Sequence, residues 1–172
     1  YQAHRDRFVP VDGFRQLAES IWLVPKTAAD PRFDSREATL LQKQSDETYI
    51  PDDFSHEHAL VFLQNGELIV FSSCSHGGIV NIVRSVQQQL GGLPVGAVLG
   101  GLHMYSPGVN DLNCPPEYVR SVARELKAMG VRRLWTGHCT GPRALALLED
   151  ELDGQAHALT TGLQISRDHN AI

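Results

Sequence analysis

Three successive units, each an apolar strand, a glycine-containing loop and a helix, constrain the fold of this chain more than any other feature. A hairpin precedes them. Its arms, residues 59–63 and 68–71, are almost continuously apolar, and Asn65-Gly66 between them is a strong turn signal. Arms this apolar suit strands that are buried on both faces. The helix that follows is predicted from apolar residues at helical spacing, namely Ile79, Ile82, Val83, Val86 and Leu90.

The second and third units repeat this order. A strand over 95–99 leads through a loop to a helix that begins at Pro115-Pro116, and Gly130 ends that helix. A strand over 131–135 then leads to a helix that begins at Pro142. Strands that alternate with helices predict an α/β protein with a mixed sheet and flanking helices.

The segments outside these units carry weaker signals. Residues 21–24 predict a short strand, whereas residues 27–36 and 45–54 are predicted to be loops. Residues 38–43 fit a strand or a helix, and residues 158–165 predict a last strand or two. With 172 residues and a mass of 19.0 kDa, the chain is interpreted as a single domain over 1–172.

Composition excludes several classes of function. The net charge is -5 and the isoelectric point about 5.9, and no cluster of Lys or Arg offers a nucleic-acid surface. No segment approaches the ~20 apolar residues of a membrane helix, so no membrane partner is expected. Three cysteines, an odd and small number, argue against a disulfide framework and for a reducing, cytoplasmic location.

Three histidines follow the three apolar strands. His76, His103 and His138 each lie just past a strand and beside glycine, which is the edge where α/β proteins bind ligands. A hydrogen-bonded turn histidine is the alternative for any one of them. Imidazole is a common metal ligand, and a catalytic zinc site takes three protein ligands. The three together therefore predict a shared metal site, with zinc or a similar divalent ion.

Other polar residues near these loops allow more than one interpretation. His56 and Cys74 are placed at the rim of the site, and His58 is taken as a polar edge before a buried strand. A thiolate at Cys74 or Cys139 is a possible nucleophile or soft-metal ligand, but a small buried side chain is favoured for Cys139. Cys114 is predicted to be inert in its loop.

Two helix starts beside the histidines are candidate anion sites. Gly77 and Gly78 begin one helix, and Thr140 and Gly141 precede another. Free backbone N–H groups at such places suit a phosphate or carboxylate of a substrate. Simple capping, for instance by Thr140, is the alternative.

Four segments resemble motifs of the metallo-β-lactamase superfamily in the same order, in the branch typified by the dihydropterin ribofuranosyl-aminobenzene phosphate synthases. They are residues 52–61, 73–83, 100–103 and 136–141, and Thr161-Gly162-Leu163 fits the closing segment. The resemblance implies an αβ/βα sandwich, of which this chain is the C-terminal portion. The superfamily's His-x-His-x-Asp-His motif belongs to an N-terminal half that these 172 residues do not contain.

The resemblance also implies roles for individual residues. His76 and His138 match metal ligands of the superfamily, and His103 either completes the site or contacts substrate. The intact protein would hold one or two ions, and a metal-bound hydroxide would attack a small molecule that carries a phosphate. Glu57 would assist as a residue that orients a ligand.

Two other hypotheses remain open at this stage. The first is a ligand-binding fragment without catalysis, and the second is a thiol-based redox protein that uses Cys74 and Cys139. The resemblance further implies that the chain forms a homo-oligomer or pairs with a missing N-terminal segment, because half a sandwich exposes the apolar face of its sheet.

Overall fold

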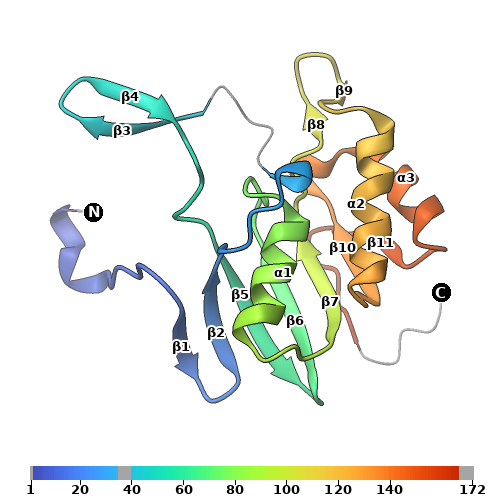
Figure 1. The fold of residues 1–172 in the computed structure, drawn as a ribbon, viewed down its shortest axis with the longest axis horizontal. Helices are drawn as coiled ribbons and strands as arrows, with labels where there is room; N and C mark the ends of the chain where they lie inside the picture. Colours follow the sequence, from blue (N-terminus) through green and yellow to red (C-terminus); the bar gives the residue numbers. More distant parts are fainter. Residues whose placement is uncertain (1, 35–39, 167–172) are drawn as a thin grey trace.

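A seven-stranded mixed sheet forms the centre of the computed structural model, which describes residues 2–34 and 40–166 (Figure 1). The strand order is β1-β2-β5-β6-β7-β10-β11. The bounds are β1 (Arg15–Ala18), β2 (Ile21–Pro25), β5 (His58–Gln64), β6 (Glu67–Ser72), β7 (Val95–Gly100), β10 (Arg133–Thr136) and β11 (Ala156–Ala158). The predicted α/β class with a mixed sheet is confirmed.

The sheet changes from antiparallel to parallel at β6. Strands β1, β2, β5 and β6 pair antiparallel, whereas β6, β7, β10 and β11 run parallel to their neighbours. The β5–β6 hairpin turns at Asn65 and Gly66, whose φ angles of 54° and 82° suit an Asn-Gly turn. The predicted hairpin is therefore confirmed.

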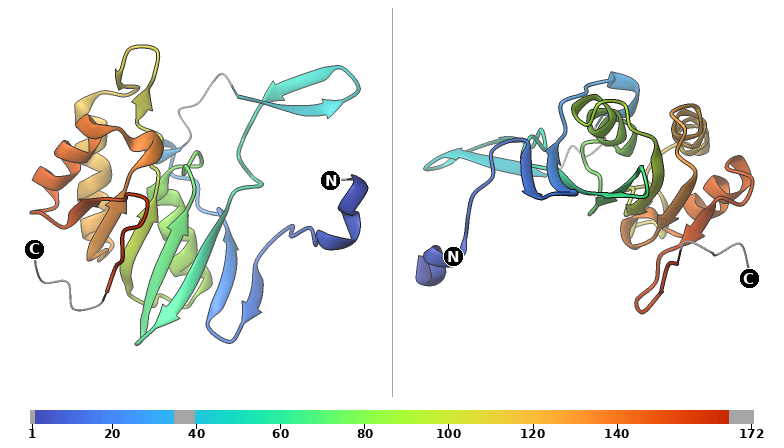
Figure 2. Two further views of the ribbon diagram at one scale, coloured as in Figure 1. Left: turned by 180° about the vertical axis from the view of Figure 1, so that it is seen from behind. Right: turned by 90° about the horizontal axis from the view of Figure 1, so that it is seen from below.

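Three helices cover one face of the sheet (Figure 2). They are α1 (Ile79–Gln89), α2 (Pro116–Ala128) and α3 (Pro142–Glu151), and each connects two parallel strands. Their apolar stripes meet the sheet in one core that includes Val70, Val83, Val98, Leu126 and Leu134. Burial of these side chains against the sheet fixes where the loops after each strand emerge.

The opposite face of the sheet carries a smaller apolar cluster. Ala97, Leu99 and Trp135 are buried there, with Ile69 and Leu159 packed against them. Phe71 on the same face is 38% exposed. A hollow of about 780 Å³ runs over this face. The sheet is thus closely packed on its helical face and more open on the other.

Residues 27–33 lie across α1 and are held by its polar side chains. Ser85 Oγ accepts the N–H groups of Thr27 and Ala28 at 2.9 and 2.8 Å, and Asn81 Oδ1 accepts that of Asp30 at 3.0 Å. These bonds place the short 3₁₀ helix η2 (Pro31–Phe33) beside the start of α1. The predicted loop over 27–36 therefore contains a helical turn as far as it is described, and residues 35–39 lie outside the described part.

The predicted loop over 45–54 is wrong in part. Strands β3 (Leu41–Ser45) and β4 (Thr48–Pro51) form a hairpin of their own, which extends away from the main sheet in Figure 1. Most residues of both strands are exposed, because neither strand packs on the core. Short strands β8 (Tyr105–Ser106) and β9 (Asp111–Leu112) form a further hairpin, and 3₁₀ helices η1 (Gln2–Arg7) and η3 (His138–Thr140) complete the described elements.

The last strand is also shifted from its predicted place. It covers Ala156–Ala158 instead of residues 158–165, because the chain turns away from the sheet edge after Leu159 donates to the carbonyl of Thr136. Among the helices that the structure describes, none has the length and apolar content needed to cross a membrane.

Candidate functional site

Strands β6, β7 and β10 end side by side at one edge of the sheet. Ser72 pairs with Gly100, and Gly100 pairs with Thr136. Because the strands are parallel, the three loops that follow emerge together. His76, His103 and His138 stand on these loops, so the common edge predicted for their loops is confirmed. Their use as metal ligands stays a prediction.

Two of the three imidazoles are in contact. The ring centroids of His76 and His103 are 4.1 Å apart, with an angle of 47° between the ring planes. Phe54 stacks on the other side of His76, with centroids 4.7 Å apart and planes only 9° from parallel. The two imidazoles are thus in ring contact, and the stacked phenyl ring restricts how His76 turns.

Glu57 holds the loop that carries His76. Its carboxylate oxygens accept the backbone N–H of His76 at 3.0 Å and of Gly77 at 2.7 Å. The N–H of Gly78 donates to the carbonyl of Ser75 at 3.0 Å. At this predicted anion site the protein's own carboxylate therefore occupies the Gly77 donor, and binding of an external anion there stays a prediction.

Hydrogen bonds also link the three loops to one another. Ser75 Oγ donates to the carbonyl of Gly101 at 2.7 Å. Thr140 Oγ1 accepts the N–H of Leu102 at 2.9 Å and lies 2.5 Å from Thr136 Oγ1. Thr140 is fully buried, so its hydroxyl bonds groups of the protein interior. Gly141 is the N-cap of α3, and a Cβ there would lie 2.8 Å from the side chain of Tyr105.

Four residues other than glycine adopt positive φ angles around this edge. They are Phe54 at 53°, Ser75 at 56°, His103 at 49° and His138 at 52°. Such conformations are uncommon for residues with a Cβ, and they persist only when the surroundings fix them. The loop hydrogen bonds supply that constraint, and the clustering of strain at one edge is typical of functional sites.

A group of three potential ligands lies at the same edge. The donor atoms of Cys74, His138 and Cys139 all lie within 4.8 Å of one another. Burial raises the pKa of the Cys139 thiol to about 11, although the N–H of His103, 3.3 Å from its sulfur, acts in the opposite direction. Cys139 is half-buried and lies beside two other potential ligands, and the choice between a small buried side chain and a metal ligand stays open.

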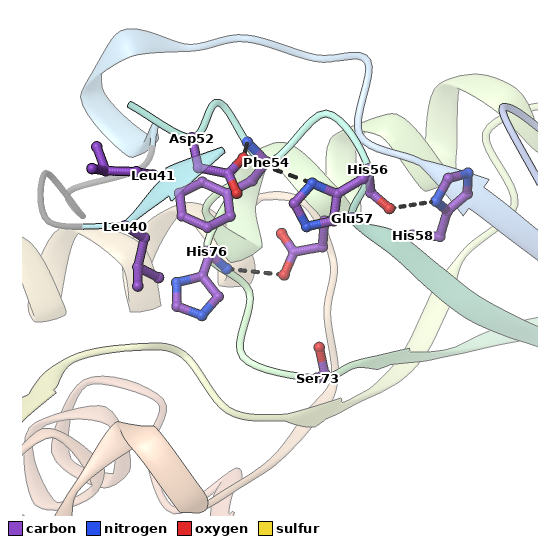
Figure 3. A pocket seen from close by; sticks show the side chains of 9 residues that line it. All are labelled: Leu40, Leu41, Asp52, Phe54, His56, Glu57, His58, Ser73 and His76. Atoms are coloured by element: carbon purple, nitrogen blue, oxygen red, sulfur yellow. Dashed lines mark hydrogen bonds and ion pairs between the residues drawn. The ribbon is translucent and has the colours of Figure 1, made fainter. Parts of the chain in front are cut away.

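A pocket of about 450 Å³ opens beside His76 (Figure 3). Its lining includes His56, Glu57, His58 and Ser73 as well as Phe54 and Asp52. His56 lines this pocket, with its Nδ1 3.7 Å from Asp52 Oδ1, and its place at the rim of a metal site stays a prediction. His58 Nδ1 lies 2.9 Å from the carbonyl of His56, which accepts from it.

Sequence analysis missed Phe54, Ser75 and Thr136 as parts of the site. Their contacts join residues far apart in sequence, such as Phe54 with His76 or Thr136 with the carbonyl of Gly100. The aspartates at 52 and 53 before Phe54 were the available signal, since each accepts a backbone N–H two residues later and so forms an Asx turn.

The fold matches that of a solved metal-dependent hydrolase of the β-lactamase superfamily. The TM-score is 0.78 at 22% sequence identity, over 93% of this chain and 58% of that chain. A metallo-β-lactamase from Erythrobacter litoralis superposes less well, with a TM-score of 0.35 at 16% identity over 83% of this chain and 47% of that chain. This chain has the metallo-β-lactamase fold, as its motifs predicted.

Sequence comparison points to a particular relative. The 7,8-dihydropterin-6-methyl-4-(β-D-ribofuranosyl)-aminobenzene-5'-phosphate synthase of Methanocaldococcus jannaschii is 30% identical over 130 residues, which are 76% of this chain and 42% of that protein. The chain thus spans less than half of the length of this relative. No protein-family model matches the chain. The resemblance to that branch of the superfamily is confirmed.

Proposed function

We propose that this chain carries the C-terminal part of a metal-dependent hydrolase site. The observation that carries the proposal is the convergence of three histidine-bearing loops at the ends of β6, β7 and β10, with His76 and His103 in ring contact. His76 and His138 would hold zinc or a similar divalent ion. His103 would complete the ligand set or stabilise charge on the substrate.

Each residue has a defined task in this proposal. The ion supplies Lewis acidity and lowers the pKa of water when it is bound. Glu57 fixes the loop of His76 through two backbone N–H groups, and Phe54 fixes the imidazole plane by stacking. The pocket beside His76 is large enough for part of a small molecule, and a phosphate ester is the proposed substrate class.

Zinc binding to the chain tests the ligand assignment. We expect His76→Ala and His103→Ala to weaken zinc binding at least about tenfold, whereas His157→Ala, on the far strand β11, serves as the control. Isothermal titration measures each affinity. Equal affinities in all three variants would contradict the assignment.

Hydrolysis tests the function itself. We expect residues 1–172 alone to hydrolyse a nitrophenyl phosphodiester near background, and turnover to appear when a segment with a His-x-His-x-Asp-His motif is fused before them. His76→Ala should abolish the restored turnover. If the fused protein binds a phosphate ester without converting it, the ligand-binding alternative is favoured instead.

Association through the open face of the sheet is part of the proposal. Ile69, Phe71 and Trp135 lie on that face, and a second copy of the chain or the complementing segment would cover them. Light scattering measures the outcome, and a stable monomer of 19.0 kDa would contradict it. We also propose a reducing, cytoplasmic location for the chain.

A further inference from the structure

We propose that Cys74, His138 and Cys139 form a site for one thiophilic divalent ion, such as Zn²⁺ or Cd²⁺. This goes beyond the proposed function, because it assigns two sulfur ligands that the hydrolase proposal does not use. His138 is common to both proposals. The two cysteines are specific to this one, and the experiment below is therefore built on them.

The fold brings the three side chains together from two loops. Cys74 follows β6 by two residues, and His138 with Cys139 begins η3 directly after β10. β7 lies between these strands, so only the loops, and not the strands, allow the contact. Cys74 and Cys139 are 65 residues apart in sequence. Nothing local therefore requires their sulfurs to meet.

The separations are close to those of a tetrahedral centre. Zinc–sulfur bonds of ~2.3 Å and zinc–nitrogen bonds of ~2.0 Å give donor–donor distances of roughly 3.5 to 3.8 Å. The donor atoms here lie within 4.8 Å of one another. Contraction by about 1 Å, which side-chain rotation readily supplies, would complete the ligand set.

One contact at Cys139 favours a sulfur that carries negative charge, against the burial that raises the pKa of this thiol. The backbone N–H of His103 points at Sγ from 3.3 Å, and N–H donation stabilises a thiolate ligand. Gly101 leaves room for the sulfur, because a Cβ at that position would lie 2.6 Å from Sγ. Space and a hydrogen-bond donor are both provided at this atom.

The group formed by Cys74, His138 and Cys139 is accessible to solvent on one side. His138 is exposed, while Cys74 and Cys139 are half-buried, so an ion can enter from solvent. Three protein ligands leave the fourth position of a tetrahedral ion for water or another ligand. Two sulfurs and one imidazole favour soft ions and disfavour Mg²⁺ and Ca²⁺, which prefer oxygen ligands.

Cadmium titration of the fully reduced chain tests the proposal. The probe is Cd²⁺ alone, followed by the sulfur-to-cadmium charge-transfer absorption in the ultraviolet. We expect one equivalent to saturate the absorption, with no displacement by excess Mg²⁺. Cys74→Ser and Cys139→Ser should each lower the affinity more than about 100-fold, since loss of a ligand costs more than loss of an outer partner.

Cys114→Ser is the matched control, because Cys114 is also half-buried but lies outside the group. Its cadmium absorption and affinity should equal those of the unchanged chain. The proposal is overturned if the unchanged chain gives no charge-transfer absorption, or if both Cys74→Ser and Cys139→Ser retain it in full.

Cadmium-113 NMR of the unchanged chain keeps the test valid if a cysteine variant fails to fold. A chemical shift in the range of two sulfur ligands supports the proposal, and a shift of nitrogen and oxygen ligands alone overturns it. The two proposals fail separately. If no sulfur ligation is found but zinc binding depends on His76, only the cysteine-site proposal is overturned. If sulfur ligation is found but zinc binding does not depend on His76 or His103, only the hydrolase assignment is overturned.

Discussion

Substitution of Gly78 tests how the loop of His76 is built. Gly78 caps α1 with φ 82° and ψ 118°, a conformation that residues with a Cβ rarely adopt. A Cβ there would lie 1.7 Å from the carbonyl oxygen of Phe33. That oxygen belongs to the backbone of η2, so Gly78→Ala must displace either η2 or the start of α1.

The expected cost combines two contributions. A residue with a Cβ at positive φ costs about 1–2 kcal/mol. Phe33 is only 4% exposed, and moving η2 exposes part of a side chain whose full burial contributes about 1.5–3 kcal/mol. We therefore expect Gly78→Ala to lower the free energy of unfolding by about 2–4 kcal/mol.

Gly91 offers a matched control at the other end of α1. Its φ is 68°, and a Cβ there would meet no atom within 4 Å. Gly91→Ala should therefore cost only the conformational contribution, about 1–2 kcal/mol. Urea denaturation followed by circular dichroism measures both variants. Equal losses for Gly78→Ala and Gly91→Ala would refute the claim that contact with η2 requires a glycine at the cap.

Three further predictions concern polar contacts. Glu57→Gln should lower the free energy of unfolding by about 1–2 kcal/mol in urea denaturation, because hydrogen bonds to a charged group are stronger than hydrogen bonds between neutral groups. An unchanged denaturation midpoint would contradict this expectation. Ser85→Ala should lower the free energy of unfolding by about 2–4 kcal/mol in the same assay, since two backbone N–H groups lose their acceptor. Ser121→Ala, which removes one hydrogen bond to a carbonyl, should lower it less. The hydrogen bond from Arg32 is the main reason that the pKa of Asp30 lies far below its usual 3.8. The stability that Asp30 contributes is therefore present above about pH 4, and it is lost as the pH falls further. Asp30→Asn should flatten that acid dependence in unfolding curves at successive pH values, and an unaltered acid slope would count against the assignment.

The elements with local signals could be predicted from sequence. The Asn65-Gly66 turn, the apolar stripe of α1 and the prolines that begin α2 and α3 each act within a few residues, and all four features stand where they were expected. Strand β4 could not be predicted in the same way. It pairs only with β3, outside the core, so its residues carry no alternation of apolar and polar side chains that burial would impose.

The candidate site was predicted as far as strand order allows. Strand–loop–helix units imply that the loops share an edge, which places His76, His103 and His138 near one another. Which side chains then meet depends on register and on loop shape. The pairing of Ser72, Gly100 and Thr136 sets the level along the strands at which each loop begins. Contacts of this kind bring Cys74 beside His138 and its neighbour Cys139, and the separation of 65 residues between the two cysteines does not predict that contact.

The candidate site is formed by contacts between loops of this chain. The loop after β6 is bonded to the loop after β7 through Ser75 and Gly101, and the loop after β7 is bonded to η3 through Leu102 and Thr140. These bonds hold a residue with unfavourable φ, such as His103, in place. Because a pre-formed set of side chains need not be ordered when an ion binds, less binding energy is lost to ordering. The histidine and cysteine ligands proposed here are therefore expected to bind metal in residues 1–172 themselves. The proposed hydrolysis is expected to appear only when a segment with a His-x-His-x-Asp-His motif is added.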